Sequence, residues 1–131
     1  DTVNSIGYAD LADLKSQGVK TYASLKNPAG EYVLPTTASA GKFISKQTNL
    51  QPSGLVGLDW SAKIKGAYNL VAVSYIIGPN GGTDAKSKAV EDYAKYLINS
   101  CGPKQAGKLG YIPMSGKMLD LAKTQIEKFS N

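Results

Sequence analysis

One apolar run constrains this chain more than any other feature of its sequence. Residues 68–77 read YNLVAVSYII, carry no charged side chain and are rich in β-branched and aromatic residues. A continuous apolar run of this length is typical of a β-strand that is covered on both of its faces. The sequence therefore predicts a buried strand over these residues.

Short strand patterns alternate with helical patterns along the whole chain, which indicates the α/β class. Near the N-terminus, residues 5–8 predict a strand that turns directly into a helix over residues 9–17, with Gly18 as its stop. Residues 19–34 predict a β-hairpin, because a turn that contains proline and glycine separates two short β-prone runs.

A second helix is predicted after the hairpin. Thr36 or Thr37 can cap its N-terminus, because a threonine hydroxyl accepts a hydrogen bond from a free backbone N–H of the first turn. Residues 48–66 are rich in turn residues, and Trp60, the only tryptophan, is expected to pin this loop to the core. Helical spacing predicts an inward face that comprises Ala40, Phe43 and Ile44.

Two longer helices are predicted after the apolar run. Thr83 and Asp84 should cap the first one, and the carboxylates of Glu91 and Asp92 should lie on its polar side. That helix should end near residues 101–103 and be followed by a short helical piece over residues 104–109. The predicted inward faces comprise Val90, Tyr93, Ala94, Leu97 and Ile98 in the first helix and Met118, Ala122, Ile126 and Phe129 in the last.

The composition excludes several kinds of site. All fifteen basic residues are lysines spread along the chain, so the net charge of +5 fits a solvated surface better than a nucleic-acid interface. Histidine is absent and Cys101 is the single cysteine, which removes histidine general bases, Cys/His zinc sites and an internal disulfide. We therefore expect no enzyme activity, no metal and no cofactor, and we expect Cys101 to be a small buried apolar residue. No apolar run reaches the roughly 18 residues that a membrane span needs, so none is predicted.

The loop after the apolar run has the general layout of an anion cradle. Residues 76–84, IIGPNGGTD, place a glycine-rich loop between a strand pattern and a helix N-terminus. The loop lacks the Gly-Lys-Ser/Thr ending of a P-loop and the Gly-x-Gly-x-x-Gly pattern of a dinucleotide site. Asp84 in the first helical turn would also repel an anion, so a capped turn is the favoured interpretation.

Five short strings follow one another along the chain: SIGYADL, LKNPAGEYVLPT, LDWSAKI, YNLVAVSYII and LGYIPMS. In this order and spacing they resemble the substrate-binding proteins of phosphate ABC transporters, which have the type II periplasmic-binding-protein fold. The resemblance extends over essentially all 131 residues. The chain departs from the family at Asn4 and Ser5, where many members have Pro-Gly before Ile-Gly-Tyr.

The resemblance implies an α/β fold with a mixed sheet flanked by helices, which is part of a two-lobed protein and is incomplete without an upstream segment. Residues 1–67 would finish the second lobe, residues 68–77 would cross the hinge as a strand, and residues 78–131 would complete the first lobe. A strand shared between lobes contributes to the balance of open and closed forms without touching ligand. The hinge-strand residues singled out in this way are Tyr68, Asn69, Ser74 and Tyr75.

The resemblance also implies a function, the capture of inorganic phosphate for import by an ABC permease. The protein would work in the periplasm or on the extracellular face of the membrane, where a lipid anchor could hold it. The family's phosphate contacts come before the Ile6-Gly7-Tyr8 strand, so no ligand-binding residue is expected in this chain. Two alternatives stay open. One is a binding protein for another oxyanion, or a secreted relative used in adhesion or signalling. The other is a stand-alone α/β module that binds a protein partner.

Overall fold

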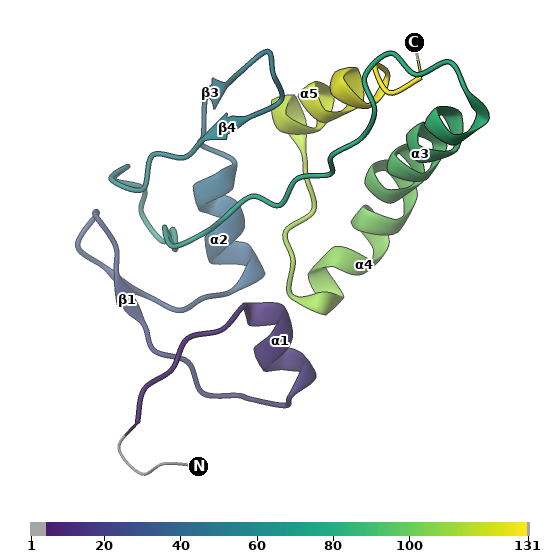
Figure 1. Cartoon of the computed structure of the whole chain (residues 1–131). Helices are drawn as coiled ribbons and strands as arrows, with labels where there is room; N and C mark the ends of the chain where they lie inside the picture. The colour runs from purple at the N-terminus through teal and green to yellow at the C-terminus, as the bar shows by residue number, and fades with distance from the viewer. Residues whose placement is uncertain (1–4, 131) are drawn as a thin grey trace.

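The computed structural model describes residues 5–130, in which five short α-helices are combined with two small antiparallel hairpins (Figure 1). The presence of both kinds of element agrees with the α/β class. The mixed sheet is not formed within these residues, because the described strands pair only two by two. A strand can join a larger sheet only where a neighbouring strand offers free backbone groups, and residues 5–130 supply few such strands.

The N-terminal segment leads into helix α1, Leu11–Ser16. The predicted strand over residues 5–8 is wrong for the described chain, because Ile6 and Tyr8 lie fully exposed and the segment pairs with no described strand. The predicted helix after it is confirmed in a shorter form. Gly18 ends it as predicted, with a φ of 70° that side chains with a Cβ rarely adopt. Asn4 lies outside the described residues.

The predicted hairpin is confirmed but is shorter than its pattern. Strands β1, Leu25–Lys26, and β2, Tyr32–Val33, pair antiparallel, with Leu25 opposite Val33. The turn between them is closed by a bond from the Gly30 N–H to the Asn27 carbonyl of 2.9 Å. Residues 19–24 form no strand, since no described strand lies beside them to pair with their backbone.

A buried asparagine holds this hairpin against a distant part of the chain. Asn27 is only 6% exposed. Its side-chain amide donates to the carbonyl oxygens of Ala67 at 3.0 Å and Ile64 at 3.3 Å. Its own oxygen accepts the N–H of Glu31 at 2.9 Å. The Glu31 carboxylate in turn accepts the N–H of Gly66, and this bond lowers the pKa of Glu31 below its ordinary value.

Helix α2, Thr37–Ile44, begins as the sequence predicts. The Thr36 hydroxyl accepts the N–H of Ser39 at 3.0 Å, and the Ser39 hydroxyl accepts the N–H of Thr36, which together form a capping box. Phe43 on the predicted inward face is fully buried. The main-chain carbonyl of Ser39 accepts the N–H of Tyr68 at 3.1 Å, so this helix also positions the start of the apolar run.

A second hairpin follows, in a stretch that the sequence predicts to be a loose loop. Strands β3, Asn49–Leu50, and β4, Val56–Gly57, pair antiparallel, with Leu50 opposite Val56. Turn residues dominate this stretch, and only two residues on each side form the ladder, which explains why its strand pattern is hard to detect.

The apolar run is extended but is not a strand in the described chain. Residues 68–77 cross the middle of the molecule from the α2 side towards α3 (Figure 1), and no described strand pairs with them. The predicted burial on both faces is also wrong, because Leu70 and Ile77 are 70% and 93% exposed. Composition can specify an extended backbone, but a strand also needs a neighbour to bond with.

The next helical segment is longer than predicted. Helix α3, Ala85–Tyr96, continues through a π-helical turn, η1 at Leu97–Cys101, into helix α4, Gly102–Leu109. The predicted end at residues 101–103 is therefore wrong. Pro103 is tolerated because it lies in the first turn of α4, directly after the π-helical turn. At this position its missing N–H removes little helix hydrogen bonding. Cys101 lies in this turn and is half-buried.

The buried face of α3 differs from the predicted one at two positions. Tyr93, predicted to face inward, is 62% exposed, whereas Glu91, predicted to lie on the polar side, is 5% exposed. Burial of the carboxylate is possible because it bonds to the ammonium of Lys95 and to the hydroxyl of Ser130. The residues of this helix and of η1 that are buried are Ser87, Glu91, Ala94 and Ile98.

Helix α5, Gly116–Ile126, closes the C-terminal half by packing on α3. Its predicted inward residues Met118 and Ile126 are buried, as expected. Ile126 forms a small core with Ala94 and Ile98, and three residues of the C-terminal region pack on this core: Leu119, Ala122 and Phe129.

Replacing Asn27 by alanine should lower the free energy of unfolding by about 2 kcal/mol. The substitution leaves the buried carbonyl of Ala67 without this donor, whereas the carbonyl of Ile64 still accepts the N–H of Ala67. An unsatisfied buried polar group is costly. Urea titration followed by circular dichroism measures the change. Asn99→Ala is the matched control, because the amide of Asn99 bonds within its own exposed turn and its loss should cost under about 0.5 kcal/mol. Equal losses in the two variants would contradict the role of Asn27.

Glu91 should make the stability of the chain depend on acid pH. Bonds from Lys95 and Ser130 lower the pKa of Glu91 from 4.5 to about 2 in the folded chain. Because folding depresses this pKa, the stabilisation is fully present above pH 4.5 and is lost as the pH falls towards 2.

The Glu91→Gln variant tests this dependence. It should be less stable than the parent chain at pH 7 and should lose less stability between pH 4.5 and 2, measured by thermal unfolding. Asp92→Asn is the control, because Asp92 is an exposed partner of Lys88 and should contribute little. A Glu91→Gln variant with the same pH profile as the parent would exclude this carboxylate as the cause.

Candidate functional site

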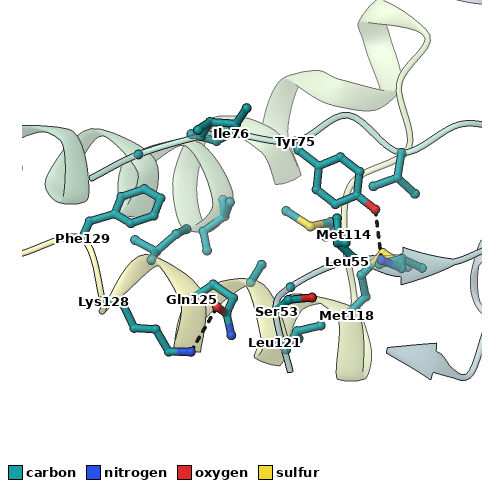
Figure 2. A pocket seen from close by; sticks show the side chains of 18 of the residues that line it. Ser53, Leu55, Tyr75, Ile76, Met114, Met118, Leu121, Gln125, Lys128 and Phe129 are labelled. Atoms are coloured by element: carbon teal, nitrogen blue, oxygen red, sulfur yellow. Dashed lines mark hydrogen bonds between the residues drawn. The ribbon is translucent and has the colours of Figure 1, made fainter. Parts of the chain in front are cut away.

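An open groove runs along one side of α5 and has a volume of about 740 Å³. Residues 73–80 form one wall, residues 52–56 form another, and α5 forms the floor (Figure 2). The apolar side chains that line it include Tyr75, Ile76, Met114, Met118, Leu121 and Phe129.

The local sequence explains why the groove has this shape. On α5, Met118, Leu121 and Gln125 recur at helical spacing and present one stripe to the groove. At the far end, Gly78 lets the chain cross the ring of Phe129, since a Cβ at this position would lie 2.4 Å from the Cε2 atom of the ring. A larger residue there would force the wall away from the floor.

Two hydrogen bonds tie the parts of the groove together, and a third is local to the C-terminal end of α5. The hydroxyl oxygen of Tyr75 accepts the N–H of Val56 at 3.0 Å, which joins the apolar run to β4 (Figure 2). The side-chain amide of Gln125 donates to the carbonyl of Pro52 at 3.0 Å, and its oxygen accepts a bond from the Lys128 ammonium at 3.1 Å. The loop over residues 52–56 is thus tied to both the apolar run and α5.

The groove is suited to an apolar occupant. Among its described lining residues, Lys128 is the one that carries a charge, and its ammonium is already bonded to Gln125. An oxyanion site needs several directed donors or cations around the anion. The described walls do not offer such a set, whereas their aliphatic, thioether and aromatic side chains can bury apolar groups from water.

A second, smaller cavity of about 440 Å³ lies beside β1 and is lined by Trp60, Tyr68 and Asn69. Trp60 is half-exposed, but its indole N–H donates to the Val71 carbonyl at 3.1 Å. Its predicted anchoring role is therefore confirmed in part, with the apolar run as the anchor point. Partial burial raises the pKa of the Tyr68 hydroxyl above its ordinary value.

Asn69 is buried but incompletely bonded. Its side-chain N–H groups donate to the carbonyl oxygens of Trp60 and Ala62, each at 3.0 Å. Its side-chain oxygen is buried and has no hydrogen-bond partner among the described residues. Such an atom is costly to leave unpaired, so the described residues satisfy this amide only in part.

The structure does not bring the four predicted hinge-strand residues into one site. Tyr68 and Asn69 line the smaller cavity, whereas Ser74 and Tyr75 lie at the groove. The sequence did not reveal the contributions of Gln125 and of the loop over residues 52–56. Their role follows from contacts across more than 70 positions of sequence, for which a local pattern carries no signal.

The glycine-rich loop is a capped turn, as the sequence analysis favours. The N–H of Gly81 donates to the Lys128 carbonyl at 2.8 Å, and the N–H of Gly82 donates to the Phe129 carbonyl at 3.2 Å. The Asp84 carboxylate accepts the N–H of Ser87 at 2.7 Å, and this bond lowers the pKa of Asp84. The donors that an anion would need are thus bonded to the chain itself.

Residues 5–130 contain neither a cluster of metal-ligating side chains nor a helix that could span a membrane. Over residues 5–130, no three histidine, cysteine, aspartate or glutamate side chains come together in a way that could hold a metal ion. In the same part of the chain, the helices are all too short or too polar to cross a membrane.

Comparison with known proteins shows similarity to binding proteins for phosphate. The protein named phosphate-binding protein PstS of Xylella fastidiosa strain Temecula1 is 33% identical over 114 residues, which cover 84% of this chain. The protein of the same name from strain 9a5c is 32% identical over the same share. The chain spans about 30% of the length of these relatives. No protein-family model matches the sequence, and no solved structure matches it.

Replacing Tyr75 by phenylalanine should loosen the wall between the apolar run and β4. The ring stays in place, but the Val56 N–H loses its acceptor, so its amide should exchange with solvent on the order of tenfold faster. Hydrogen exchange followed by NMR measures this rate. Tyr93→Phe is the control, because Tyr93 is exposed on α3 and the exchange of Val56 should not change. Unchanged exchange in the Tyr75→Phe variant would show that the bond does not hold the wall.

Proposed function

We propose that this chain is the C-terminal part of a two-lobed phosphate-binding protein that captures inorganic phosphate for import by an ABC transporter. The observation that carries the proposal is the 33% identity to a phosphate-binding protein over 84% of the chain, supported by a similar match to a second protein of that name. The chain corresponds to less than a third of those proteins, so the complete activity belongs to a longer polypeptide.

The described residues support the placement of phosphate outside this chain. The groove is apolar, and the loop donors beside α3 are bonded to the chain itself. Phosphate would be held by directed hydrogen-bond donors between two closing lobes, and these donors would lie on the polypeptide upstream of the Ile6-Gly7-Tyr8 segment. Residues 68–77 would pass between the lobes, with residues 1–67 in the second lobe and residues 78–131 in the first.

The proposal also specifies a cellular location and a partner. The complete protein would act in the periplasm or on the extracellular face of the membrane and would hand phosphate to a permease. It would bind and release its ligand without chemical change, in keeping with the absence of histidine from the sequence. A lipid anchor upstream of this chain would be compatible with this role.

A second candidate is a protein-interaction module, and the open apolar groove is the observation that favours it. The two functions differ in what the 131-residue chain does alone. A module should be monodisperse and unfold cooperatively without further polypeptide, whereas part of a two-lobed protein should gain stability when the upstream polypeptide is present. Sedimentation and thermal unfolding of both forms separate the candidates.

The 131-residue chain alone should show no submillimolar affinity for phosphate. The expected reason is that the donors lie on the upstream polypeptide and that the described groove does not suit an anion. Isothermal titration with inorganic phosphate measures the affinity. Titration of a longer polypeptide that includes the upstream residues is the positive control, with sulfate as the competing oxyanion.

Two results would contradict this proposal. Submillimolar phosphate binding by the short chain would place the site within these 131 residues. No phosphate binding by the longer polypeptide would reject the function, and displacement of phosphate by sulfate would favour a different oxyanion as the ligand.

A further inference from the structure

Residues 128–130 form a short segment beyond helix α5. The helix ends at Ile126, and the chain leaves it through a turn that is closed by a bond of 3.0 Å from the Phe129 N–H to the Ile126 carbonyl. Lys128 is exposed, whereas Phe129 and Ser130 are half-buried although they belong to no helix or strand. Burial outside regular secondary structure requires tertiary contacts that offset the loss of backbone freedom.

The backbone of this segment holds the glycine-rich loop. The Lys128 carbonyl accepts the N–H of Gly81 at 2.8 Å, and the Phe129 carbonyl accepts the N–H of Gly82 at 3.2 Å. In the described part of the chain, residues 72–80 make no backbone–backbone hydrogen bonds. The two carbonyls are therefore the first points at which the backbone is fixed after the apolar run.

The ring of Phe129 adds a packing contact to these bonds. It packs on the small core of the C-terminal half, and a Cβ at Gly78 would lie 2.4 Å from its Cε2 atom. A Cβ at Gly82 would lie 3.3 Å from the Phe129 carbonyl oxygen. The loop can approach the segment this closely because both positions lack a side chain.

Ser130 joins the same segment to α3. Its hydroxyl donates to the carboxylate of Glu91, which is buried and also bonded to the Lys95 ammonium. Hydrogen bonds to a charged group are stronger than those between neutral groups. The segment is thus bonded to the loop through its carbonyls and to α3 through its last hydroxyl.

Lys128 also contributes to the opposite wall of the groove. Its ammonium donates to the Gln125 side-chain oxygen at 3.1 Å, and the amide of Gln125 donates to the Pro52 carbonyl at 3.0 Å. Figure 2 shows Lys128 and Phe129 at one end of the groove and Met118 at the other. Contacts to both walls therefore meet at residues 128–130.

We propose that residues 128–130 are a strap that fastens one end of the groove, and that this strap detaches as a unit while α3 and α5 stay folded. Few bonds hold the strap, and all of its residues lie outside the helices, whereas Ile126 anchors α5 in the core. Release frees both walls at this end and exposes Glu91 to water. The inference goes beyond the proposed function, because every contact lies within residues 5–130 and none involves phosphate.

Native-state hydrogen exchange at increasing urea concentration tests whether the strap opens by itself. The amides of Gly81 and Gly82 should exchange through one shared opening that hardly depends on urea, because a small opening exposes little surface. The Ala94 amide, in the core of α3, should need a larger free energy with a strong urea dependence. Equal free energies and urea slopes at all three amides would overturn the proposal, because the loop would then open only when the chain unfolds.

Ser130→Ala removes the bond between the strap and Glu91. It should speed exchange of the Gly81 and Gly82 amides in the absence of urea by about tenfold. Ser45→Ala is the matched control, because the Ser45 hydroxyl bonds within its own exposed turn and its loss should leave both rates unchanged. Unchanged exchange in the Ser130→Ala variant would contradict the strap.

Gly78→Ala should displace the strap from the other side, because the new Cβ would meet the Phe129 ring. It should also speed exchange of the amides bonded to the strap by about tenfold. Gly107→Ala is its control, since a Cβ there meets nothing within 4 Å. Equal rates in the two glycine variants would reject the contact as part of the device.

Spin labels test whether the strap fastens the two walls. Labels at Ser53→Cys and Asn80→Cys, which are exposed positions on opposite walls, are introduced in a Cys101→Ser background. Pulsed electron resonance should give a narrow distance distribution in this background and a broader one when Gly78→Ala is added. The same distribution in both would show that the walls do not depend on the strap and would overturn the proposal.

Discussion

The side-chain amide of Asn27 is the interaction on which the N-terminal half of this structure depends. A turn residue between two very short strands reaches across to the carbonyls of Ile64 and Ala67, almost forty positions away in sequence. That contact fixes the position of the chain just before the apolar run. The bond from the Tyr68 N–H to the Ser39 carbonyl then sets the direction in which the run extends. The extended run begins where it does because polar groups, more than apolar packing, hold its first residues.

Residues 68–77 connect two small hydrophobic cores, and the described chain completes neither of them. Phe43 and Ala67 are buried on one side, and Ala94, Ile98 and Ile126 form the cluster on the other. The most apolar segment of the sequence runs between them with much of its surface in water (Figure 1). Exposed apolar surface of this extent is typical of interaction sites. The matched region makes up only 30% of the length of the similar proteins, which is in keeping with this interpretation.

The predictions that succeeded depend on neighbours in sequence. Thr36 and Asp84 accept bonds from the third residue after them, so a local pattern contains both partners of each cap. The predictions that failed depend on distant partners. Glu91 is buried because Lys95 and Ser130 bond to its carboxylate, and Ser130 comes from the far end of the chain. The groove was missed for the same reason, since Gln125 meets Pro52 only in the folded molecule.

The sequence by itself determined the α/β character, the helix starts, the turn at residues 27–30 and the extended, uncharged nature of residues 68–77. Each of these follows from side-chain chemistry within a few positions, which acts in the same way wherever the segment lies. Only the tertiary structure decided which face of α3 is buried and which carboxylate is buried from solvent. It also decided that the apolar run pairs with no described strand. Those outcomes depend on whether a partner arrives from elsewhere in the chain, and for the backbone groups of residues 72–77 no hydrogen-bonding partner does so among the described residues.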